Sequence, residues 1–259
     1  MIHPTAVVAK EAKIGKNVTV GAYSVIDEHV VLEDGCSIGP HVYVTGYTVV
    51  GSGTQIHKGA VIGDAPQDIS YTGFTAYTRI GSKCIIREYV TVHRGSKPEA
   101  STVVGDNCML MAFSHVAHDC QIGSHVVIAN HSQIAGHVEI FDKAIISGGV
   151  FVHQFCKIGS MAMIGGTAKI NQDIPPFCLV NHDSRITSLN AIGLKRNGVS
   201  ADERGKIRQA FKNILFGQKP RSQAIKEEQG KYPQCDAYNM FVDFIADSKR
   251  GIQDTITRS

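Results

Sequence analysis

The chain has 259 residues, of which 43% are hydrophobic and 19% are charged, so it is long enough to bury a substantial core. This balance excludes a mostly disordered chain, and no apolar run approaches the length of a membrane span. The formal net charge of +3 excludes a chain whose whole surface binds nucleic acid. The first residues lack a charged segment followed by an apolar stretch, so we expect a cytoplasmic protein with no secretory signal and no stable membrane insertion.

An aliphatic residue returns every six positions from Ile2 to Ile170. Of the 29 positions in this register, 26 carry Val, Ile or Leu, and the exceptions are Asp68, Phe74 and Pro98. Four positions after each aliphatic residue, the regular stretches carry only Ala, Val, Ser, Thr or Cys, whose small side chains suit a tight inward corner. Such a period is typical of a solenoid with three short strands in each coil of about 18 residues. The sequence therefore predicts a parallel β-helix, whose handedness the period itself leaves open.

Glycine and cysteine have regular places in this repeat. Gly follows the aliphatic residue in several coils, as in Ile14-Gly15 and Ile122-Gly123, where we expect a corner that needs a permissive backbone. Seven cysteines without a secretory signal favour free thiols over disulfides. Five of them lie in the small inward register, which makes them packing residues rather than nucleophiles: Cys36, Cys84, Cys108, Cys120 and Cys156.

The register breaks near residues 64–79 and 95–102 and resumes in phase each time. We interpret both breaks as loops that leave the coil, and such excursions usually form the functional face of a solenoid. After Pro175-Pro176 the period stops and helix-forming residues follow. We expect a β-helix over residues 1–186 and a C-terminal α-helical domain over residues 187–259.

The C-terminal part carries two helix signals and a basic stretch. Ser200-Ala201-Asp202-Glu203 is a capping box that predicts a helix running to a stop near Gly217, and a second helix is expected around residues 238–244. Between Lys195 and Arg221, eight Lys or Arg residues occur with two acidic residues, a local net charge of +6. This stretch is either a solvated helical face or a docking surface for an acidic partner.

Histidines cluster beyond the second break, most suggestively in the segment 115–120. Because Val116 and Cys120 occupy the two inward registers, His118 points out of the coil with Asp119 beside it. A carboxylate that holds one ring nitrogen leaves the other to accept a substrate proton, which is the arrangement of a general base. His137 and His153 each follow about one coil further along, so they can line the same groove as His118.

The same residues also suggest other chemistries. Three histidines near a groove suit zinc, as in a β-helical class of carbonic anhydrase, but the ligand spacing of that class is missing here. Cys120 lies in the buried register, which argues against a thiol nucleophile. A non-enzymatic structural β-helix is disfavoured by the two loops and the outward histidines. We therefore expect an enzyme that uses neither a metal nor another cofactor, and a zinc-dependent carbonic anhydrase stays a remote alternative.

Several motifs in chain order resemble the UDP-N-acetylglucosamine acyltransferases, the enzymes that begin lipid A synthesis. Besides the coils, the resemblance is carried by Ala65-Pro66-Gln67-Asp68, His115-Val116-Ala117-His118-Asp119-Cys120, Ile134-Ala135-Gly136-His137-Val138, Val152-His153-Gln154-Phe155-Cys156 and Gly193-Leu194-Lys195-Arg196. The resemblance covers essentially the whole chain. It implies a left-handed parallel β-helix, assembled as a homotrimer with active sites in the clefts between subunits.

The resemblance also implies a reaction and its residues. An (R)-3-hydroxyacyl group would pass from acyl carrier protein to the 3-hydroxyl of UDP-N-acetylglucosamine, without a covalent enzyme intermediate. His118 matches the general base, Asp119 the residue that orients it, and the backbone N–H of Gly136 the oxyanion donor. The remaining matches are substrate contacts: Gln67, Asp68, His115 and His137 at the sugar, His153 and Gln154 in the nucleotide and acyl region, Asn190 and Arg196 at the nucleotide, and Met163 and Gly166 where the acyl chain ends.

Three positions depart from the family pattern. Ser70 stands where members often have Lys, Ile192 where an acidic nucleotide contact is common, and Asn197 where a second Arg often follows Arg196. These departures leave the general base intact, and they keep open an acceptor that carries a 3-amino group and would form an amide. The basic stretch fits docking of acyl carrier protein, which is acidic.

Overall fold

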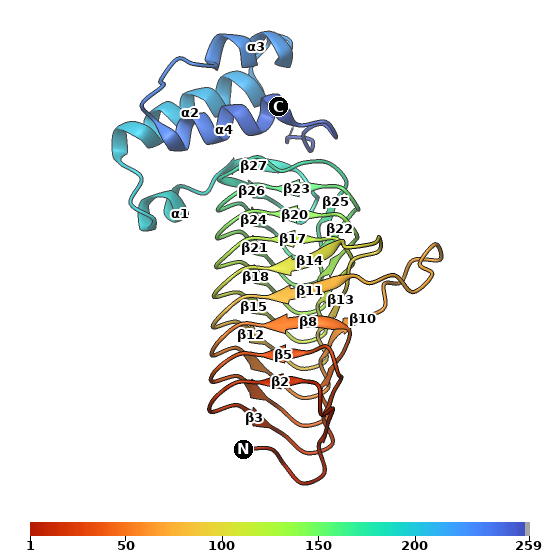
Figure 1. Ribbon diagram of the computed structural model, residues 1–259. Helices are drawn as coiled ribbons and strands as arrows, with labels where there is room; N and C mark the ends of the chain where they lie inside the picture. Colours follow the sequence, from red (N-terminus) through yellow and green to blue (C-terminus); the bar gives the residue numbers. More distant parts are fainter. Residues whose placement is uncertain (257–259) are drawn as a thin grey trace.

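The computed structural model describes residues 1–256 as a three-sided column of short strands with a layer of helices at its C-terminal end (Figure 1). Each coil gives one strand to each of three sheets, which we call I, II and III. Sheet I contains β1 (Val7–Val8), β4 (Val25–Ile26), β7 (Tyr43–Val44), β10 (Val61–Asp64), β13 (Thr91–His93), β16 (His115–Val116), β19 (Gln133–Ile134), β22 (Phe151–Val152) and β25 (Lys169–Ile170).

The other two sheets follow in the same rotation along the chain. Sheet II contains β2 (Lys13–Ile14), β5 (Val31–Leu32), β8 (Tyr47–Val50), β11 (Tyr77–Ile80), β14 (Ser101–Val104), β17 (Gln121–Ile122), β20 (Glu139–Ile140) and β23 (Lys157–Ile158). Sheet III contains β3 (Thr19–Val20), β6 (Ser37–Ile38), β9 (Gln55–Ile56), β12 (Ile85–Ile86), β15 (Met109–Leu110), β18 (Val127–Ile128), β21 (Ile145–Ile146), β24 (Met163–Ile164), β26 (Cys178–Val180) and β27 (Ile186–Leu189). All named pairs are parallel except β26 with β27, so the predicted parallel β-helix is confirmed.

The core of the column consists of the two registers that the sequence pattern singled out. Aliphatic residues such as Leu32, Ile62 and Ile128 are at most 1% exposed, and small corner residues such as Cys36 and Ala144 are fully buried. Burial of an aliphatic side chain of this size stabilises the folded chain by about 1.5–3 kcal/mol. The column therefore rests on continuous stacking of like residues from one coil to the next.

The corners differ from the expectation for glycine. Gly15 and Gly21 follow their aliphatic residues as predicted, yet the left-handed backbone of the corners is adopted by other residues, including Asp119 and His137, both with φ of 60°. A Cβ added to Gly15 or Gly21 would lie 2.6 Å from an atom of the coil above. The prediction of a permissive backbone at these glycines is thus wrong, because close approach between coils is what requires them.

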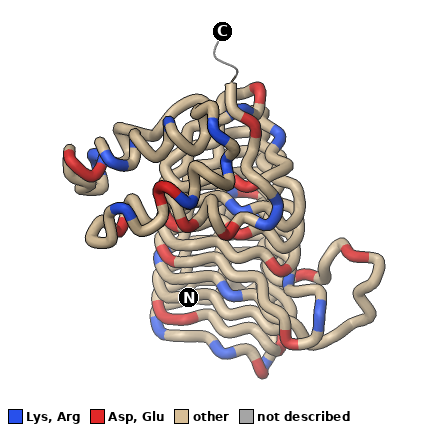
Figure 2. Tube along the Cα trace, turned by 90° about the horizontal axis from the view of Figure 1, so that it is seen from above, with Lys and Arg blue, Asp and Glu red and all other residues tan. Residues whose placement is uncertain are grey.

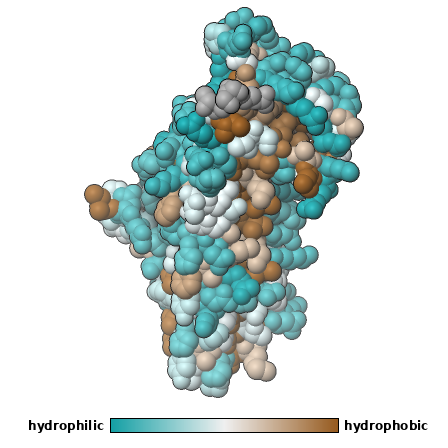
Figure 3. Space-filling model, turned by 180° about the vertical axis from the view of Figure 1, so that it is seen from behind, coloured by the Kyte–Doolittle hydropathy of each residue, from teal (hydrophilic) through white to brown (hydrophobic). Residues whose placement is uncertain are grey.

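Both predicted excursions leave the column between sheets I and II. The first connects β10 to β11 and projects far from the column (Figure 1), and Ile69 within it is fully exposed. The second is shorter and connects β13 to β14. Seen from behind, apolar side chains also gather in a strip along the column and beneath the helices (Figure 3).

Four helices follow the column within the described residues: α1 (Ala191–Arg196), α2 (Ala201–Phe216), α3 (Arg221–Glu228) and α4 (Asp236–Asp247). The predicted capping box opens α2, because the hydroxyl of Ser200 accepts from the backbone N–H of Glu203, whose carboxylate accepts from the N–H of Ser200. Buried Phe211 and Phe241 pack α2 against α4. The chain then returns to the column, where Ile252 bridges to Asp173. Among the described helices, none has the length and apolar character needed to cross a membrane.

Candidate active site

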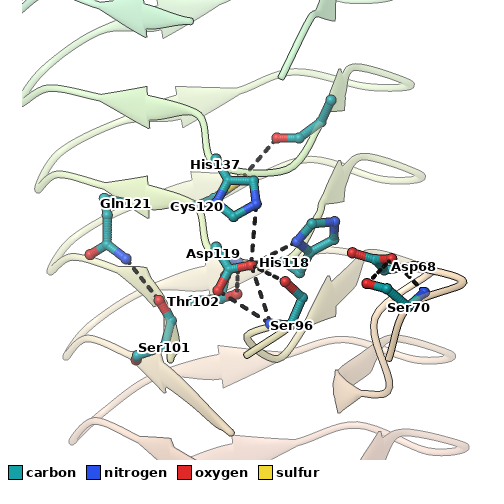
Figure 4. Close-up of polar contacts among 11 residues, drawn as sticks. Asp68, Ser70, Ser96, Ser101, Thr102, His118, Asp119, Cys120, Gln121 and His137 are labelled. Carbon is teal, nitrogen blue, oxygen red and sulfur yellow. Dashed lines mark hydrogen bonds and ion pairs between the residues drawn. The ribbon is translucent and has the colours of Figure 1, made fainter. Parts of the chain in front are cut away.

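His118 and Asp119 lie at the corner between β16 and β17 (Figure 4). Nδ1 of His118 is 2.7 Å from Oδ2 of Asp119, and the two side chains are only 13% and 10% exposed. The backbone N–H of Asp119 donates to the hydroxyl of Thr102 at 2.8 Å, which fixes the turn. Because the carboxylate holds Nδ1–H, Nε2 is the ring nitrogen left to accept a proton. The outward histidine and its acidic partner therefore form the dyad that their register predicts.

Ser96, in the second excursion, holds the carboxylate of this dyad. Its hydroxyl donates to Oδ2 of Asp119 at 2.7 Å, and its backbone N–H lies 3.2 Å from both carboxylate oxygens. Burial disfavours the charged form of Asp119, but hydrogen bonds from Ser96 and His118 outweigh burial and lower its pKa. Sequence reasoning missed Ser96, and the only signal for it was its place in a segment that breaks the repeat.

Gly136 lies one coil above His118, against the face of the imidazole. A Cβ at this position would be 2.5 Å from Cε1 and 2.7 Å from Nε2 of His118. Among the described residues, no acceptor faces the backbone N–H of Gly136. The glycine thus leaves room for the ring, and its backbone N–H is without a partner in the described part of the chain.

His137 shares the same carboxylate from the next coil. Its Nε2 is 3.6 Å from Oδ2 of Asp119, and its ring stacks on Phe155 with centroids 4.6 Å apart. The His137 and His118 rings meet edge to face at 5.2 Å. Burial lowers the pKa of His137 although Asp119 acts in the opposite direction. One largely enclosed carboxylate therefore faces two imidazoles from successive coils.

A groove of about 400 Å³ runs over the outer face of sheet I beside the dyad. Gln67, His115, His118, Gly136 and His153 all line it. Nδ1 of His115 lies 2.7 Å from the hydroxyl of Thr91. Burial and the neighbouring histidines lower the pKa of His115 to about 4, so its ring is neutral at pH 7. The groove thus combines a candidate base with polar groups, a neutral imidazole and one cation, Lys169.

Asp68 extends from the first excursion near the same corner (Figure 4). Its Oδ1 accepts from the backbone N–H of Ser70 at 2.8 Å and from the Ser70 hydroxyl at 2.7 Å. These two hydrogen bonds lower the pKa of Asp68. Ser70, which departs from the family pattern, therefore orients the carboxylate of Asp68 within the loop.

The remaining predicted contacts do not line this groove within a single chain. Met163, 41% exposed, lies on β24 of sheet III, and Gly166 lies at the corner that follows. Asn190 caps α1 by accepting from the N–H of Gly193 at 2.9 Å, and Arg196 is exposed at the end of that helix. Gln154 is exposed beside His153.

Metal and thiol chemistry can be tested against the same geometry. Ligand atoms of His118, Asp119 and His137 lie within 4.8 Å of one another. Oδ2 of Asp119 already accepts from Ser96 and His118, so a cation there would have to displace those donors. The seven cysteines are free, as predicted, and all are buried, including the five of the inward register for which burial was expected. Burial raises the pKa of Cys120 to about 12. The geometry therefore fits a base–carboxylate pair better than a metal centre or a thiolate nucleophile.

The chain is similar to known proteins over most of its length. A family model described as UDP N-acetylglucosamine O-acyltransferase, domain 2, matches residues 173–253, and one described as bacterial transferase hexapeptide (six repeats) matches residues 11–46 and 101–136. The chain is 40% identical over 246 residues to an acyl-[acyl-carrier-protein]–UDP-N-acetylglucosamine O-acyltransferase of Bartonella henselae, covering 94% of this chain and 90% of the relative. It is also 40% identical over 258 residues to the enzyme of that name from Herminiimonas arsenicoxydans, covering 97% and 98%.

A solved structure gives the same result. The UDP-N-acetylglucosamine acyltransferase of Francisella novicida superposes with a TM-score of 0.94 at 36% identity, covering 97% of this chain and 93% of that one. The left-handed parallel β-helix of hexapeptide repeats is therefore the fold of this chain. With matches of this extent in both sequence and structure, the chain belongs to the UDP-N-acetylglucosamine O-acyltransferase family.

Proposed function

We propose that the protein transfers an (R)-3-hydroxyacyl group from acyl carrier protein to the 3-hydroxyl of UDP-N-acetylglucosamine, the first step of lipid A synthesis, with His118 as general base. The observation that carries this proposal is the pairing of Nδ1 of His118 with Asp119 in close contact with Gly136, whose backbone N–H makes no hydrogen bond within the described residues. A base and an oxyanion donor side by side are what attack of a hydroxyl on a thioester requires.

The chemical step follows from these positions. Nε2 of His118 takes the proton of the 3-hydroxyl while that oxygen bonds to the thioester carbonyl carbon. The charge that develops on the carbonyl oxygen accepts the hydrogen bond of the Gly136 N–H. When the carbon–sulfur bond breaks, the carrier leaves as a thiolate. This thiolate accepts from His118 the proton that came from the 3-hydroxyl. Asp119 stays ionised throughout, and it stabilises the imidazolium that exists between the two transfers.

The groove and the residues beside it supply the sugar contacts of this proposal. Gln67, His115 and His137 surround the dyad, and Asp68 approaches from the first excursion. Neutral His115, already bonded to Thr91, offers a polar contact without competing for the proton that His118 takes. We assign His153 and Gln154 to the nucleotide and acyl region.

A homotrimer accounts for the predicted contacts that lie outside the groove of one chain. We propose that Met163 and Gly166 meet the end of the acyl chain, and that Asn190 and Arg196 meet the nucleotide, in clefts between neighbouring subunits. The apolar strip along the back of the column supports contact between subunits (Figure 3). Large side chains that remain about half exposed, such as Tyr89 and Phe113, support it independently. Because the acyl donor and the sugar nucleotide are both cytoplasmic compounds, we place the reaction in the cytoplasm.

Acyl carrier protein is the proposed partner of the basic stretch from Lys195 to Arg221. Lys and Arg positions recur along the helices at the end of the column (Figure 2). Arg208 and Lys212 are exposed one turn apart on α2, so they present one basic face. An acidic carrier would be steered toward this face before its acyl chain enters the groove.

A 3-amino UDP-sugar is the second candidate acceptor, favoured by one observation. Ser70, in place of the cation that family members often carry, donates two hydrogen bonds to Asp68 and adds no positive charge beside the sugar loop. A loop with an oriented carboxylate and no neighbouring lysine is better suited to an amine than the usual loop would be.

The deciding experiment incubates the purified protein with 3-hydroxyacyl carrier proteins of several chain lengths and either acceptor, and reads the product mass. We expect an ester of UDP-N-acetylglucosamine from the parent protein and almost none from a folded His118→Ala variant. Amide formation on the 3-amino analogue alone would establish the second candidate. No product with either acceptor would refute the proposed function.

A further inference from the structure

The C-terminal segment after α4 crosses back to the groove and touches it through Arg250. Nε of Arg250 donates to the carbonyl oxygen of Asn171 at 2.7 Å, and its Nη2 is 2.8 Å from Nδ1 of His153. Asn171 and His153 both line the groove beside His118. Arg250, from the C-terminal end of the chain, thus contacts the candidate substrate-binding residue His153, although the two are 97 positions apart in the sequence.

The contact has a chemical consequence for the proton on His153. A guanidinium is always protonated and has only donors, so Nδ1 of His153 must be the acceptor of this hydrogen bond. A neutral imidazole has one protonated nitrogen, which is then Nε2. The alternative use of Nδ1, donation to the carbonyl oxygen of Gln154, has the longer distance of 3.3 Å. The shorter, charge-assisted contact is the stronger of the two, so it decides the tautomer.

We propose that Arg250 is a positioning residue that holds His153 in the Nε2–H tautomer. This inference rests on the proposed function and adds a second role to the groove. Asp119 holds His118 with Nε2 as an acceptor, and Arg250 holds His153 with Nε2 as a donor. The groove then presents one imidazole that takes a proton and one that gives a hydrogen bond to an oxygen of the bound acyl or phosphate group.

Nitrogen NMR tests the tautomer without any substrate. Long-range proton–nitrogen correlation spectra of the full chain labelled with ¹⁵N-histidine distinguish protonated from bare ring nitrogens, and His153→Gln identifies the His153 signals by their loss. We expect bare Nδ1 and protonated Nε2 in the parent protein, and a substantial Nδ1–H population in Arg250→Met. Lys249→Met, which removes the neighbouring exposed charge, is the matched control and should leave the spectrum unchanged. Protonated Nδ1 in the neutral ring of the parent, or an Arg250→Met spectrum like that of the parent, would overturn the proposal.

Steady-state kinetics test whether the tautomer matters for turnover. Losing one directed hydrogen bond should lower kcat/KM of Arg250→Met about five- to tenfold. Arg250→Lys should recover most of this, because an ammonium also only donates. In a His153→Ala background the Arg250→Met change should not lower kcat/KM further. If kcat/KM fell there by the same factor, Arg250 would act by a route that does not involve His153. A parent protein that is inactive on both acceptors would refute the proposed function, while the spectra would still decide the tautomer.

Discussion

The imidazole of His118 lies against Gly136 so closely that a Cβ at that position would be 2.5 Å from Cε1 of the ring. Moving the ring away would break the hydrogen bond between its Nδ1 and Asp119, which is 2.7 Å long. Gly136 therefore has a reason to be glycine that is independent of its backbone conformation, since its φ is not in the left-handed region.

Gly136→Ala should abolish most activity without unfolding the column. The added methyl group must push the ring out of line, and misplacement of a catalytic group by about 1 Å can cost about 100-fold in rate. The measurement is kcat alongside the melting temperature. Gly148→Ala is the matched control, because its Cβ would meet nothing closer than 3.4 Å. Normal turnover of a folded Gly136→Ala protein would contradict the assigned contact between ring and glycine.

Much of this site was predictable because the repeat fixes which side chains leave the column. Val116 and Cys120 are both fully buried, so the outward direction of His118 followed from their registers alone. The stacking of Gly136 on His118 follows equally from a coil of 18 residues. The sequence pattern by itself, however, indicated only a tight corner at this glycine. Resemblance to a family was needed to see an oxyanion donor there.

Other parts of the site could not be derived from periodicity. Ser96 lies where the register is broken, so no period indicates which way its hydroxyl points. Arg250 reaches His153 from 97 residues away, after helices whose packing no short-range pattern describes. The short helices α1 and α3 were missed for a related reason, because α1 has six residues and α3 eight, too few for a clear helical period. Contacts made by irregular or distant segments thus required the structure.

Ser96→Ala should weaken catalysis through Asp119. The variant loses the 2.7 Å hydroxyl donor but keeps the backbone donor, so the pKa of Asp119 should rise toward its ordinary value and the carboxylate should be held less firmly. We expect kcat to fall about tenfold with little change in KM, as for loss of one hydrogen bond to a charged group. Ser101→Ala is the control, because the Ser101 hydroxyl is buried without a partner in the described structure. Equal kinetics for the two variants would remove Ser96 from the positioning of the dyad.

His115 should make the folded state less stable in mild acid. Its pKa is about 4 in the folded protein against an ordinary value of 6.5, so between these values the unfolded chain binds a proton that the folded chain does not. The contribution of His115 to the free energy of unfolding is complete above pH 6.5 and is lost as the pH falls to 4. His115→Gln should remove about 2 kcal/mol of this dependence. Asp119, whose pKa lies below its ordinary 3.8, titrates beneath this window.

Denaturant unfolding of both proteins at pH 7 and at pH 4.5 measures this contribution. The parent should lose more stability than His115→Gln between the two values, because only the parent must keep a buried imidazole neutral. A variant as acid-sensitive as the parent would show that other groups carry the effect. His93 and His137, whose pKa values are also lowered by burial, would be the groups to replace next.

Charge reversal on α2 should slow capture of acyl carrier protein and leave the chemical step intact. Arg208 and Lys212 are exposed, and glutamate sustains a helix about as well as either residue, so the double variant Arg208→Glu/Lys212→Glu should fold. Removing two attractions and adding two repulsions should raise KM for the acyl carrier about tenfold at low salt, with kcat nearly unchanged. The rate of the parent should fall as salt is added, and that of the variant should respond less. Lys10→Glu/Lys16→Glu changes the same charge at the far end of the column and should behave like the parent. If the rate of the α2 variant depended on salt as that of the parent does, the carrier would have to dock elsewhere. Reversing the charge of a basic docking face must change the electrostatic attraction that the salt screens.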